Sequence, residues 1–219
     1  MIANPLNQPG PFMKFCGMTR EKDIYAVNEA RPLFCGFIIN VPKSSRNLSL
    51  RDAEYLAGLL SEDIFPVGVF VNEPLSTIVQ MCQGGVITTV QLHGDEDDDF
   101  VDAVRDEACP SLIIQAFKIR TPEDMQRARR SHADMILLDN GWGTGQRFDW
   151  SLVGEVGRPF MLAGGLSPDN VAEAIRELHP WAVDMSSCLE TDGLKDEDKI
   201  AKAAEAVRSC VHDKENNHE

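Results

Sequence analysis

Several polar residues stand directly after apolar runs, at points where a buried strand would give way to a loop. Asp139 follows the apolar run 135–138, so partial burial would raise the pKa of its carboxyl and make it a proton donor near neutral pH. Cys16 ends the run that begins at Met13, and as a thiolate beside positive charge or amide donors it could act as a base or a nucleophile. On these residues alone, Asp139 could equally form a turn, whereas a Cys beside Gly at a strand end is a weak signal and Cys16 could simply pack in a core.

A second group consists of glycines and small polar residues. Gly164 and Gly165 lie between an apolar run and a predicted helix, where backbone N–H groups can approach a ligand closely and the helix start favours anions. This pattern favours a phosphate site over an ordinary turn. Ser186, Ser187 and Cys188 would then form the other wall of that site, since they follow a later apolar run.

The elements that must position these residues alternate between apolar runs of strand length and amphipathic stretches. We predict helices at 20–30, 49–60 and 196–210, with others opened near Pro74, at Thr121 and at Ser167, and strands at 13–17, 33–40, 65–71, 86–92, 111–117, 135–139, 160–163 and 182–185. Ser49 and Thr121 are predicted N-caps. This amounts to eight strand-then-helix units, and their near-continuous apolar strands indicate a parallel sheet buried on both faces.

The predicted fold class is therefore α/β, a single (β/α)8 TIM barrel. An open doubly wound sheet is the alternative, but the count of eight favours the closed barrel, and no GxGxxG motif follows the first strand. We expect residues 1–12 to form a poorly ordered N-terminal extension, residues 13–211 to form the barrel and residues 212–219 to form a polar C-terminal tail.

Composition argues against several classes of protein. The 219 residues carry 21 Lys plus Arg against 35 Asp plus Glu, and the net charge of -14 disfavours nucleic-acid binding. No apolar run approaches the roughly 20 residues of a membrane span, and residues 1–12 lack the features of a secretion signal, so we expect a cytoplasmic protein with no membrane partner. The six cysteines form no CxxC pair, which disfavours a disulfide framework. Since HxxxH spacing is absent as well, the sequence carries no signature of a structural zinc site.

In a barrel, reactive groups belong at the carboxyl ends of the strands. Strands 1 and 6 lie three positions apart on a ring of eight, so Cys16 and Asp139 would face each other across the mouth with one small molecule between them. Gln91 and His93 end the fourth strand on the same rim. Arg46, in the loop after the second strand, could pair with a ligand carboxylate or could be a solvated charge.

These residues fall in segments that together resemble the phosphoribosylanthranilate isomerase family. The segments are KFCGMT (14–19), GFIINVPKSSR (36–46), GVFVN (68–72), QLHGDE (91–96), ILLDN (136–140) with GTGQRFDW (143–150), LAGGLSPDNV (162–171) and VDMSSCLE (183–190). The resemblance spans Met13 to about Val211, and the order and spacing of the segments make it specific.

The resemblance implies an enzyme of tryptophan biosynthesis that uses no cofactor and no metal. Its reaction is the Amadori rearrangement of N-(5'-phosphoribosyl)anthranilate to 1-(o-carboxyphenylamino)-1-deoxyribulose 5-phosphate. The resemblance implies Cys16 as general base, Asp139 as general acid and Arg46 as the group that holds the anthranilate carboxylate. We expect a monomer or homodimer whose partner is a phosphorylated small molecule, with further binding residues Gln91, His93, Gly164, Gly165, Ser186, Ser187 and Cys188.

One position departs from the family pattern. The family usually has SSG followed by Val after the eighth strand, whereas this chain has Cys188 followed by Leu189. If that glycine needs a positive φ or leaves space for phosphate oxygens, the Cβ of Cys188 would weaken phosphate binding or shift the loop without changing the reaction. Separately, the glycine-containing segment 143–145 could form a lid or only a flexible crossover.

Other interpretations remain open on the residues alone. A metal-dependent epimerase would need clustered His and Asp ligands, but only His93 of the five histidines lies on the rim. An indole-forming synthase would need strand-end lysines, for which Lys118 and Lys14 are poor candidates, and a histidine-pathway isomerase would carry Asp in place of Cys16. A non-catalytic phosphate-binding barrel is disfavoured because the reactive residues and the glycine loop occur together.

Overall fold

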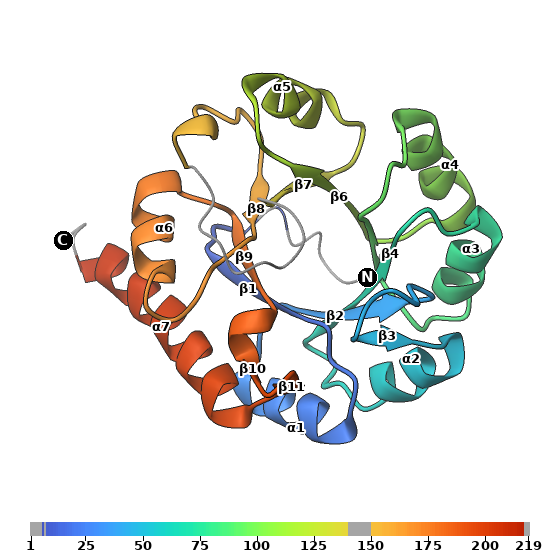
Figure 1. Cartoon of the computed structure of the whole chain (residues 1–219), viewed down its shortest axis with the longest axis horizontal. Coiled ribbons are helices and arrows are strands. Elements are labelled where there is room, and N and C mark those ends of the chain that lie inside the picture. Colours follow the sequence, from blue (N-terminus) through green and yellow to red (C-terminus); the bar gives the residue numbers. More distant parts are fainter. Residues whose placement is uncertain (1–5, 7, 140–149, 217–219) are drawn as a thin grey trace.

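The computed structural model describes residues 6, 8–139 and 150–216, with side chains as far as Cys210, and the predicted lid segment 143–145 lies outside these residues. Parallel strands form a closed ring with the helices around it (Figure 1). The strands of the ring follow the order β1, β2, β4, β5, β6, β7, β8 and β9, and pairing of β1 with both β2 and β9 closes it. The eight-stranded TIM barrel predicted from the sequence is confirmed.

The strands of the ring lie close to their predicted positions. They are β1 (Phe12–Cys16), β2 (Phe34–Ile39), β4 (Phe65–Phe70), β5 (Thr89–Leu92), β6 (Leu112–Lys118), β7 (Met135–Asp139), β8 (Phe160–Leu162) and β9 (Ala182–Met185). The short β3 (Asn47–Leu48) pairs with the end of β2, and β10 (Glu190–Thr191) forms an antiparallel hairpin with β11 (Leu194–Lys195). This hairpin, which the sequence patterns did not indicate, lies directly after the loop that follows β9.

The helices around the ring begin mostly where the capping residues predict. They are α1 (Glu21–Ala30), α2 (Leu50–Ala57), α3 (Leu75–Gln83), α4 (Asp98–Ala108), α5 (Pro122–Arg130), α6 (Val171–Leu178) and α7 (Glu197–Asn216), with the short 3₁₀ segments η2 (Trp150–Leu152) and η3 (Ser187–Leu189). The side chain of Ser49 accepts a hydrogen bond from the amide of Asp52, and Thr121 forms a capping box with Asp124. Both predicted N-caps are confirmed.

Several elements differ from the prediction. α2 ends at Ala57 rather than at residue 60, and β5 begins at Thr89 rather than at residue 86. Between η2 and β8 no α-helix occurs, because Gly154 and Gly157 have positive φ and Pro159 cannot donate a helix hydrogen bond. Residues 167–170 form a turn, so α6 begins at Val171 rather than at Ser167. At the C-terminus, α7 continues six residues past the expected end at Cys210 and includes residues 212–216 of the predicted tail.

The N-terminal residues contribute to the floor of the barrel. Phe12, assigned to the extension on sequence grounds, is the first residue of β1, and its amide donates to the carbonyl of Trp181. The indole N–H of Trp181 in turn donates to the carbonyl of Gln8. The ring centroids of Phe12 and Trp181 lie 4.7 Å apart, and Phe34 and Phe65 add further aromatic contacts, so aromatic side chains close the amino end of the interior.

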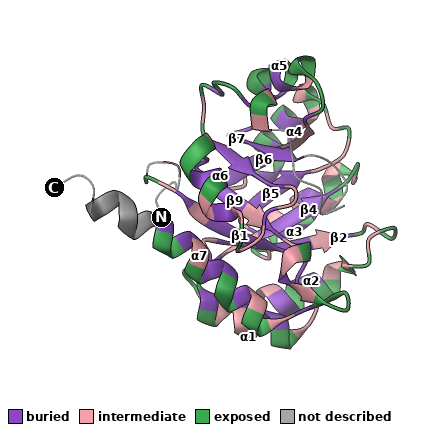
Figure 2. Ribbon diagram, turned by 60° about the vertical axis from the view of Figure 1, so that its left-hand side comes forward, coloured by how far each residue is buried: buried purple, intermediate pink, exposed green. Residues whose placement is uncertain are grey.

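Two apolar layers follow from the alternation of side chains along each strand. Residues such as Phe15, Cys35 and Phe37 face the helices, whereas Val67, Ile114, Leu137 and Met161 fill the barrel interior, and Figure 2 shows the strands as an almost continuously buried layer. At the carboxyl ends the inward positions become polar. The fold therefore places its reactive side chains at that rim.

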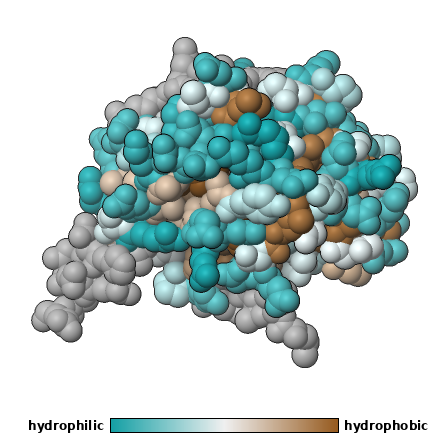
Figure 3. Space-filling view, turned by 90° about the horizontal axis from the view of Figure 1, so that it is seen from below, coloured by the Kyte–Doolittle hydropathy of each residue, from teal (hydrophilic) through white to brown (hydrophobic). Residues whose placement is uncertain are grey.

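The outer surface carries mostly charged and polar residues. On the face drawn in Figure 3, apolar residues appear as scattered patches among hydrophilic ones, in keeping with a sequence that has 35 acidic residues. Among the described helices, including the 20 residues of α7, none has the length and apolar composition needed to cross a bilayer.

Candidate active site

Cys16 lies against a buried ion pair at the carboxyl end of β1. Lys14 and Cys16 occupy alternate positions of that strand, so both face the interior, and β1 pairs with β9 so that Lys14 lies opposite Asp184. The ammonium nitrogen of Lys14, fully buried, is 3.0 Å from each carboxylate oxygen of Asp184. Gly36 on β2 leaves room for this arrangement, because a Cβ there would lie 2.8 Å from the sulfur of Cys16 and 3.2 Å from the Lys14 nitrogen.

The protonation of these groups follows from burial and from their neighbours. Burial raises the pKa of the Cys16 thiol above its ordinary value, and the cations Lys14 and Lys195 offset only part of that rise. Burial alone would lower the pKa of Lys14, but Asp184 and Cys16 outweigh it, so the pKa of Lys14 rises and its ammonium stays charged. The resting site therefore holds a neutral thiol beside a permanent cation.

Asp139 ends β7 on the same interior and faces a histidine. Its Oδ2 lies 3.9 Å from Nε2 of His93, which is too long for a direct hydrogen bond. The amide nitrogen of Gln91 donates to Nδ1 of His93 at 2.8 Å, and burial, together with the nearby Lys14 cation, lowers the pKa of His93 to about 4. His93 is therefore neutral at physiological pH, with its proton on the nitrogen that faces Asp139.

Asp184 connects the two halves of the site. It interacts electrostatically with Lys14, His93 and Asp139. Lys14 interacts with Cys16 as well, so this ion pair lies within electrostatic range of both the sulfur and the Asp139 carboxyl. No cluster of metal-ligating side chains occurs among the residues that the structure describes.

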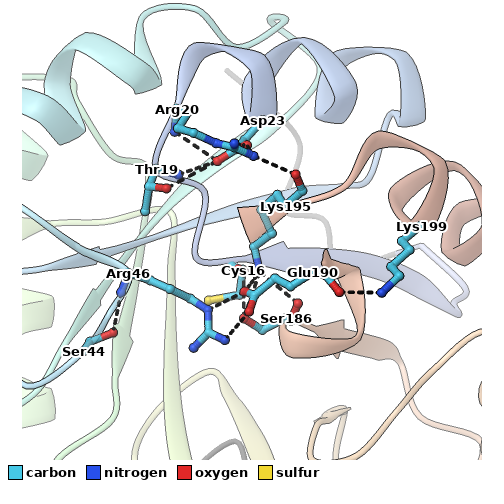
Figure 4. Close-up of polar contacts among 10 residues, drawn as sticks. All are labelled: Cys16, Thr19, Arg20, Asp23, Ser44, Arg46, Ser186, Glu190, Lys195 and Lys199. Atoms are coloured by element: carbon cyan, nitrogen blue, oxygen red, sulfur yellow. Dashed lines mark hydrogen bonds and ion pairs between the residues drawn. The ribbon is translucent and has the colours of Figure 1, made fainter. Parts of the chain in front are cut away.

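Arg46 reaches the site from the loop between β2 and β3, and Figure 4 shows it pointing toward Cys16 and Glu190. Its Nε and Nη2 donate to the two carboxylate oxygens of Glu190, on β10. Lys195 donates to the same carboxylate at 2.7 Å and to the carbonyl of Ser186 at 2.8 Å. Ser186 donates through its hydroxyl to the carbonyl of Cys16 at 2.9 Å, so these loops meet beside the sulfur.

The predicted phosphate loops lie at the ends of β8 and β9. Gly164 and Gly165 have φ of 81° and 67°, a region that favours glycine. Ser187 is exposed, and Cys188 is half-buried within η3 against the helix-facing core. Because a 3₁₀ conformation suits any L-residue, Cys188 carries no positive-φ strain, and only the space taken by its side chain could affect a ligand.

The structure thus brings Cys16, Arg46 and Ser186 together, and Gln91, His93 and Asp139 together. Sequence reasoning gave no role to the four charged residues that join and support these groups, namely Lys14, Asp184, Glu190 and Lys195. A usable signal existed for the first two: Lys14 and Asp184 are opposite charges in otherwise apolar strands, and a buried charge must be paired. No comparable pattern marked Glu190 or Lys195.

Comparison with known proteins identifies the relatives of this chain. The family profile described as N-(5'phosphoribosyl)anthranilate (PRA) isomerase matches residues 13–206. An N-(5'-phosphoribosyl)anthranilate isomerase from Endomicrobium trichonymphae is 38% identical over 204 residues, covering 91% of this chain and 99% of that protein.

Solved structures give the same result. A phosphoribosylanthranilate isomerase in complex with reduced 1-(o-carboxyphenylamino)-1-deoxyribulose 5-phosphate has a TM-score of 0.77 and 35% identity, covering 91% of this chain and 100% of its own. Monomers generated from the dimeric isomerase of Thermotoga maritima have a TM-score of 0.80 and 33% identity over the same shares. The chain therefore belongs to the N-(5'-phosphoribosyl)anthranilate isomerase family.

Proposed function

We propose that this protein converts N-(5'-phosphoribosyl)anthranilate to 1-(o-carboxyphenylamino)-1-deoxyribulose 5-phosphate with Cys16 as general base and Asp139 as general acid. One observation supports the assignment of roles: the Lys14–Asp184 ion pair interacts with the Cys16 thiol through Lys14 and electrostatically with the Asp139 carboxyl through Asp184. A sugar held between them would meet the thiol on one side and the carboxyl on the other. This is the arrangement that an internal proton transfer needs.

The reaction begins with opening of the ribose ring. Protonated Asp139 donates its proton to the ring oxygen, the bond from that oxygen to C1' breaks, and the anthranilate nitrogen supplies the electron pair that forms a protonated Schiff base. The thiolate of Cys16 then takes the proton from C2', and the released electron pair forms the C1'–C2' double bond of an enolamine. Tautomerisation of the enolamine gives the ketone product.

The surroundings of Cys16 determine how readily it becomes a thiolate. Because burial raises the pKa of the thiol, only a small fraction of the free protein carries the base form at neutral pH. The charged ammonium of Lys14 stabilises that form where it is needed, next to C2' of the substrate. Activity on free substrate should therefore increase as the pH rises from neutrality toward the pKa of the thiol.

Substrate binding uses residues on both sides of the acid–base pair. Arg46 holds the anthranilate carboxylate, and the loops with Gly164, Gly165, Ser187 and Cys188 hold the phosphate. A relative that binds the reduced product supports this class of ligand. Gln91 and His93 contact the sugar beside Asp139. The dimeric relative favours a homodimer over a monomer, which light scattering on the purified protein would test.

The test is turnover of substrate generated in place from anthranilate and phosphoribosyl pyrophosphate by the preceding transferase. We expect loss of anthranilate-type fluorescence and a product of unchanged mass. A protein that binds the reduced product but never turns over the substrate would be the non-catalytic barrel instead. A folded Cys16→Ser variant that keeps most of the turnover would remove the thiolate from the mechanism.

A further inference from the structure

The guanidinium of Arg46 is held from one side. Nε and Nη2 form two parallel bonds to Glu190, which is the bidentate geometry that fixes both distance and plane. An arginine has five N–H donors, so three remain on Nη1 and Nη2. No acceptor in the described part of the chain takes them. They form a second edge that can bind another carboxylate in the same bidentate way.

Glu190 is itself anchored by several contacts. Buried Lys195 lies opposite it in the β10–β11 hairpin, and its ammonium donates to the Glu190 carboxylate and to the Ser186 carbonyl. Lys199 of α7 donates to the backbone carbonyl of Glu190. Arg20 donates to the carbonyl of Lys195 at 2.6 Å (Figure 4). The carboxylate therefore cannot follow Arg46 if the arginine turns toward a ligand.

The start of α1 completes this support. Asp23, buried, accepts hydrogen bonds from Nε and Nη2 of Arg20 and from the amides of Thr19 and Arg20. Its position at the third residue of α1 closes the capping box of that helix. The hydrogen bonds that hold Glu190 in place thus involve the loop after β1, the loop after β9 and the β10–β11 hairpin.

The charges at this corner do not cancel. Arg46 and Lys195 contribute two positive charges and Glu190 one negative charge, so one positive charge remains beside Cys16. Both cations interact electrostatically with that thiol. Removal of the Glu190 charge would free the guanidinium to rotate and would also leave a second positive charge near the sulfur.

We propose that Glu190, held by Lys195, is a positioning residue that orients the outer edge of Arg46 toward the substrate carboxylate and limits the positive charge beside Cys16. This inference rests on the proposed function, since it needs a substrate that carries the carboxylate. A purely structural residue would not behave in this way: loss of the Glu190 charge must weaken ligand binding while it makes the Cys16 thiol more reactive.

The first experiment compares Glu190→Gln, Arg46→Ala and the double variant by steady-state kinetics. We expect Glu190→Gln to raise KM about tenfold, which is the effect of losing one well-oriented charged contact. The same change should alter kcat by less than about threefold. The double variant should resemble Arg46→Ala alone, because Glu190 acts through Arg46. A substrate made with aniline in place of anthranilate lacks the carboxylate, and its KM should not respond to Glu190→Gln.

The second experiment measures alkylation of Cys16 by iodoacetamide across pH, with the Cys16 peptide followed by mass spectrometry. The Glu190→Gln profile should move to lower pH, since the additional positive charge favours the thiolate. The variant Glu197→Gln is the matched control, because Glu197 is an exposed carboxylate that pairs with Lys22 on the surface. It should change neither KM nor the alkylation profile.

If Glu190→Gln does not fold, the variant that combines Glu190→Gln with Lys195→Met takes its place, because it removes one charge of each sign. It should raise KM and leave the alkylation profile of Cys16 unchanged. Calorimetry with the reduced product measures the same loss of affinity without turnover. A wild-type protein that does not convert the substrate refutes the proposed function. If the wild type does convert it, an unchanged KM and alkylation profile in Glu190→Gln refute the inference alone.

Discussion

Gly36→Ala tests the packing around Cys16 with the smallest possible change. The added Cβ would lie 2.8 Å from the Cys16 sulfur and 3.2 Å from Cε and Nζ of Lys14. An ordinary contact begins at 3.4 Å, so the sulfur must retreat by roughly 0.6 Å. Lys14 cannot give way instead, because its nitrogen is fully buried and is held at 3.0 Å by both oxygens of Asp184.

The size of the effect follows from two opposing contributions. Overpacking costs about 1–3 kcal/mol, and replacing a strand glycine returns about 0.5–1 kcal/mol. The free energy of unfolding should therefore fall by about 1–2 kcal/mol, which lowers the melting temperature by about 2–8 °C in a domain of this size. A displacement of 1 Å in a catalytic group can cost about 100-fold in rate, so we expect kcat to fall about tenfold or more.

The assay combines steady-state fluorescence kinetics, thermal melting and the alkylation rate of Cys16. KM should stay within about twofold, because the three atoms nearest to an added Cβ on Gly36 belong to Cys16 and Lys14 and not to the groups assigned to the carboxylate or the phosphate. Gly58→Ala is the control: its φ is -66°, and the atoms nearest to an added Cβ are backbone oxygens at 3.5 Å. Wild-type kcat and alkylation rate in Gly36→Ala would refute the packing of Cys16 against Lys14 over this glycine.

Three further predictions concern charge and space. Lys14→Met leaves the Asp184 carboxylate buried without its cation, so the free energy of unfolding measured by denaturant titration should drop by about 3–5 kcal/mol. Cys16 should also be alkylated more slowly at each pH. Adding Asp184→Asn to this variant should recover part of the stability. Cys188→Gly should tighten binding of the reduced product in calorimetry, whereas an unchanged Kd would mean that the phosphate site tolerates the side chain. The Asp102 carboxylate raises the pKa of His132. The contribution of this pair to stability is therefore complete below the unfolded pKa of about 6.5 and disappears as pH rises through the folded pKa. The melting temperatures of His132→Gln and wild type should converge at alkaline pH and differ at acid pH.

The fold was largely predictable because its signal is local. Apolar runs such as 135–138 and capping residues such as Ser49 and Thr121 define elements from their own neighbourhood, and eight strands with their connections close into a barrel. The rule that reactive groups stand at strand ends then selected Cys16 and Asp139. The count of eight strand-then-helix units implies a helix before β8, but the described residues 150–159 contain no α-helix, because Gly154 and Gly157 break helix formation there while the number of strands is unaffected.

The interactions that support the site were not predictable from local patterns. Lys14 and Asp184 are 170 residues apart in sequence and meet only because closure of the ring brings β1 beside β9. Arg46 and Glu190 are 144 residues apart and depend on the conformations of two loops. A single sequence assigns such residues a charge but not a partner. The hairpin that positions Glu190 consists of two-residue strands, which are too short to show a periodic pattern of apolar residues in the sequence.

In the proposed mechanism, Cys16 and Asp139 perform the two proton transfers on one bound sugar. Cys16→Ala and Asp139→Asn, each compared with wild type in kcat and in calorimetric affinity for the reduced product, test it most directly. We predict that each variant loses at least about 100-fold in kcat, the scale of a lost general acid or base, while its Kd stays within about threefold. A folded variant of either residue that keeps most of the wild-type kcat would contradict this mechanism.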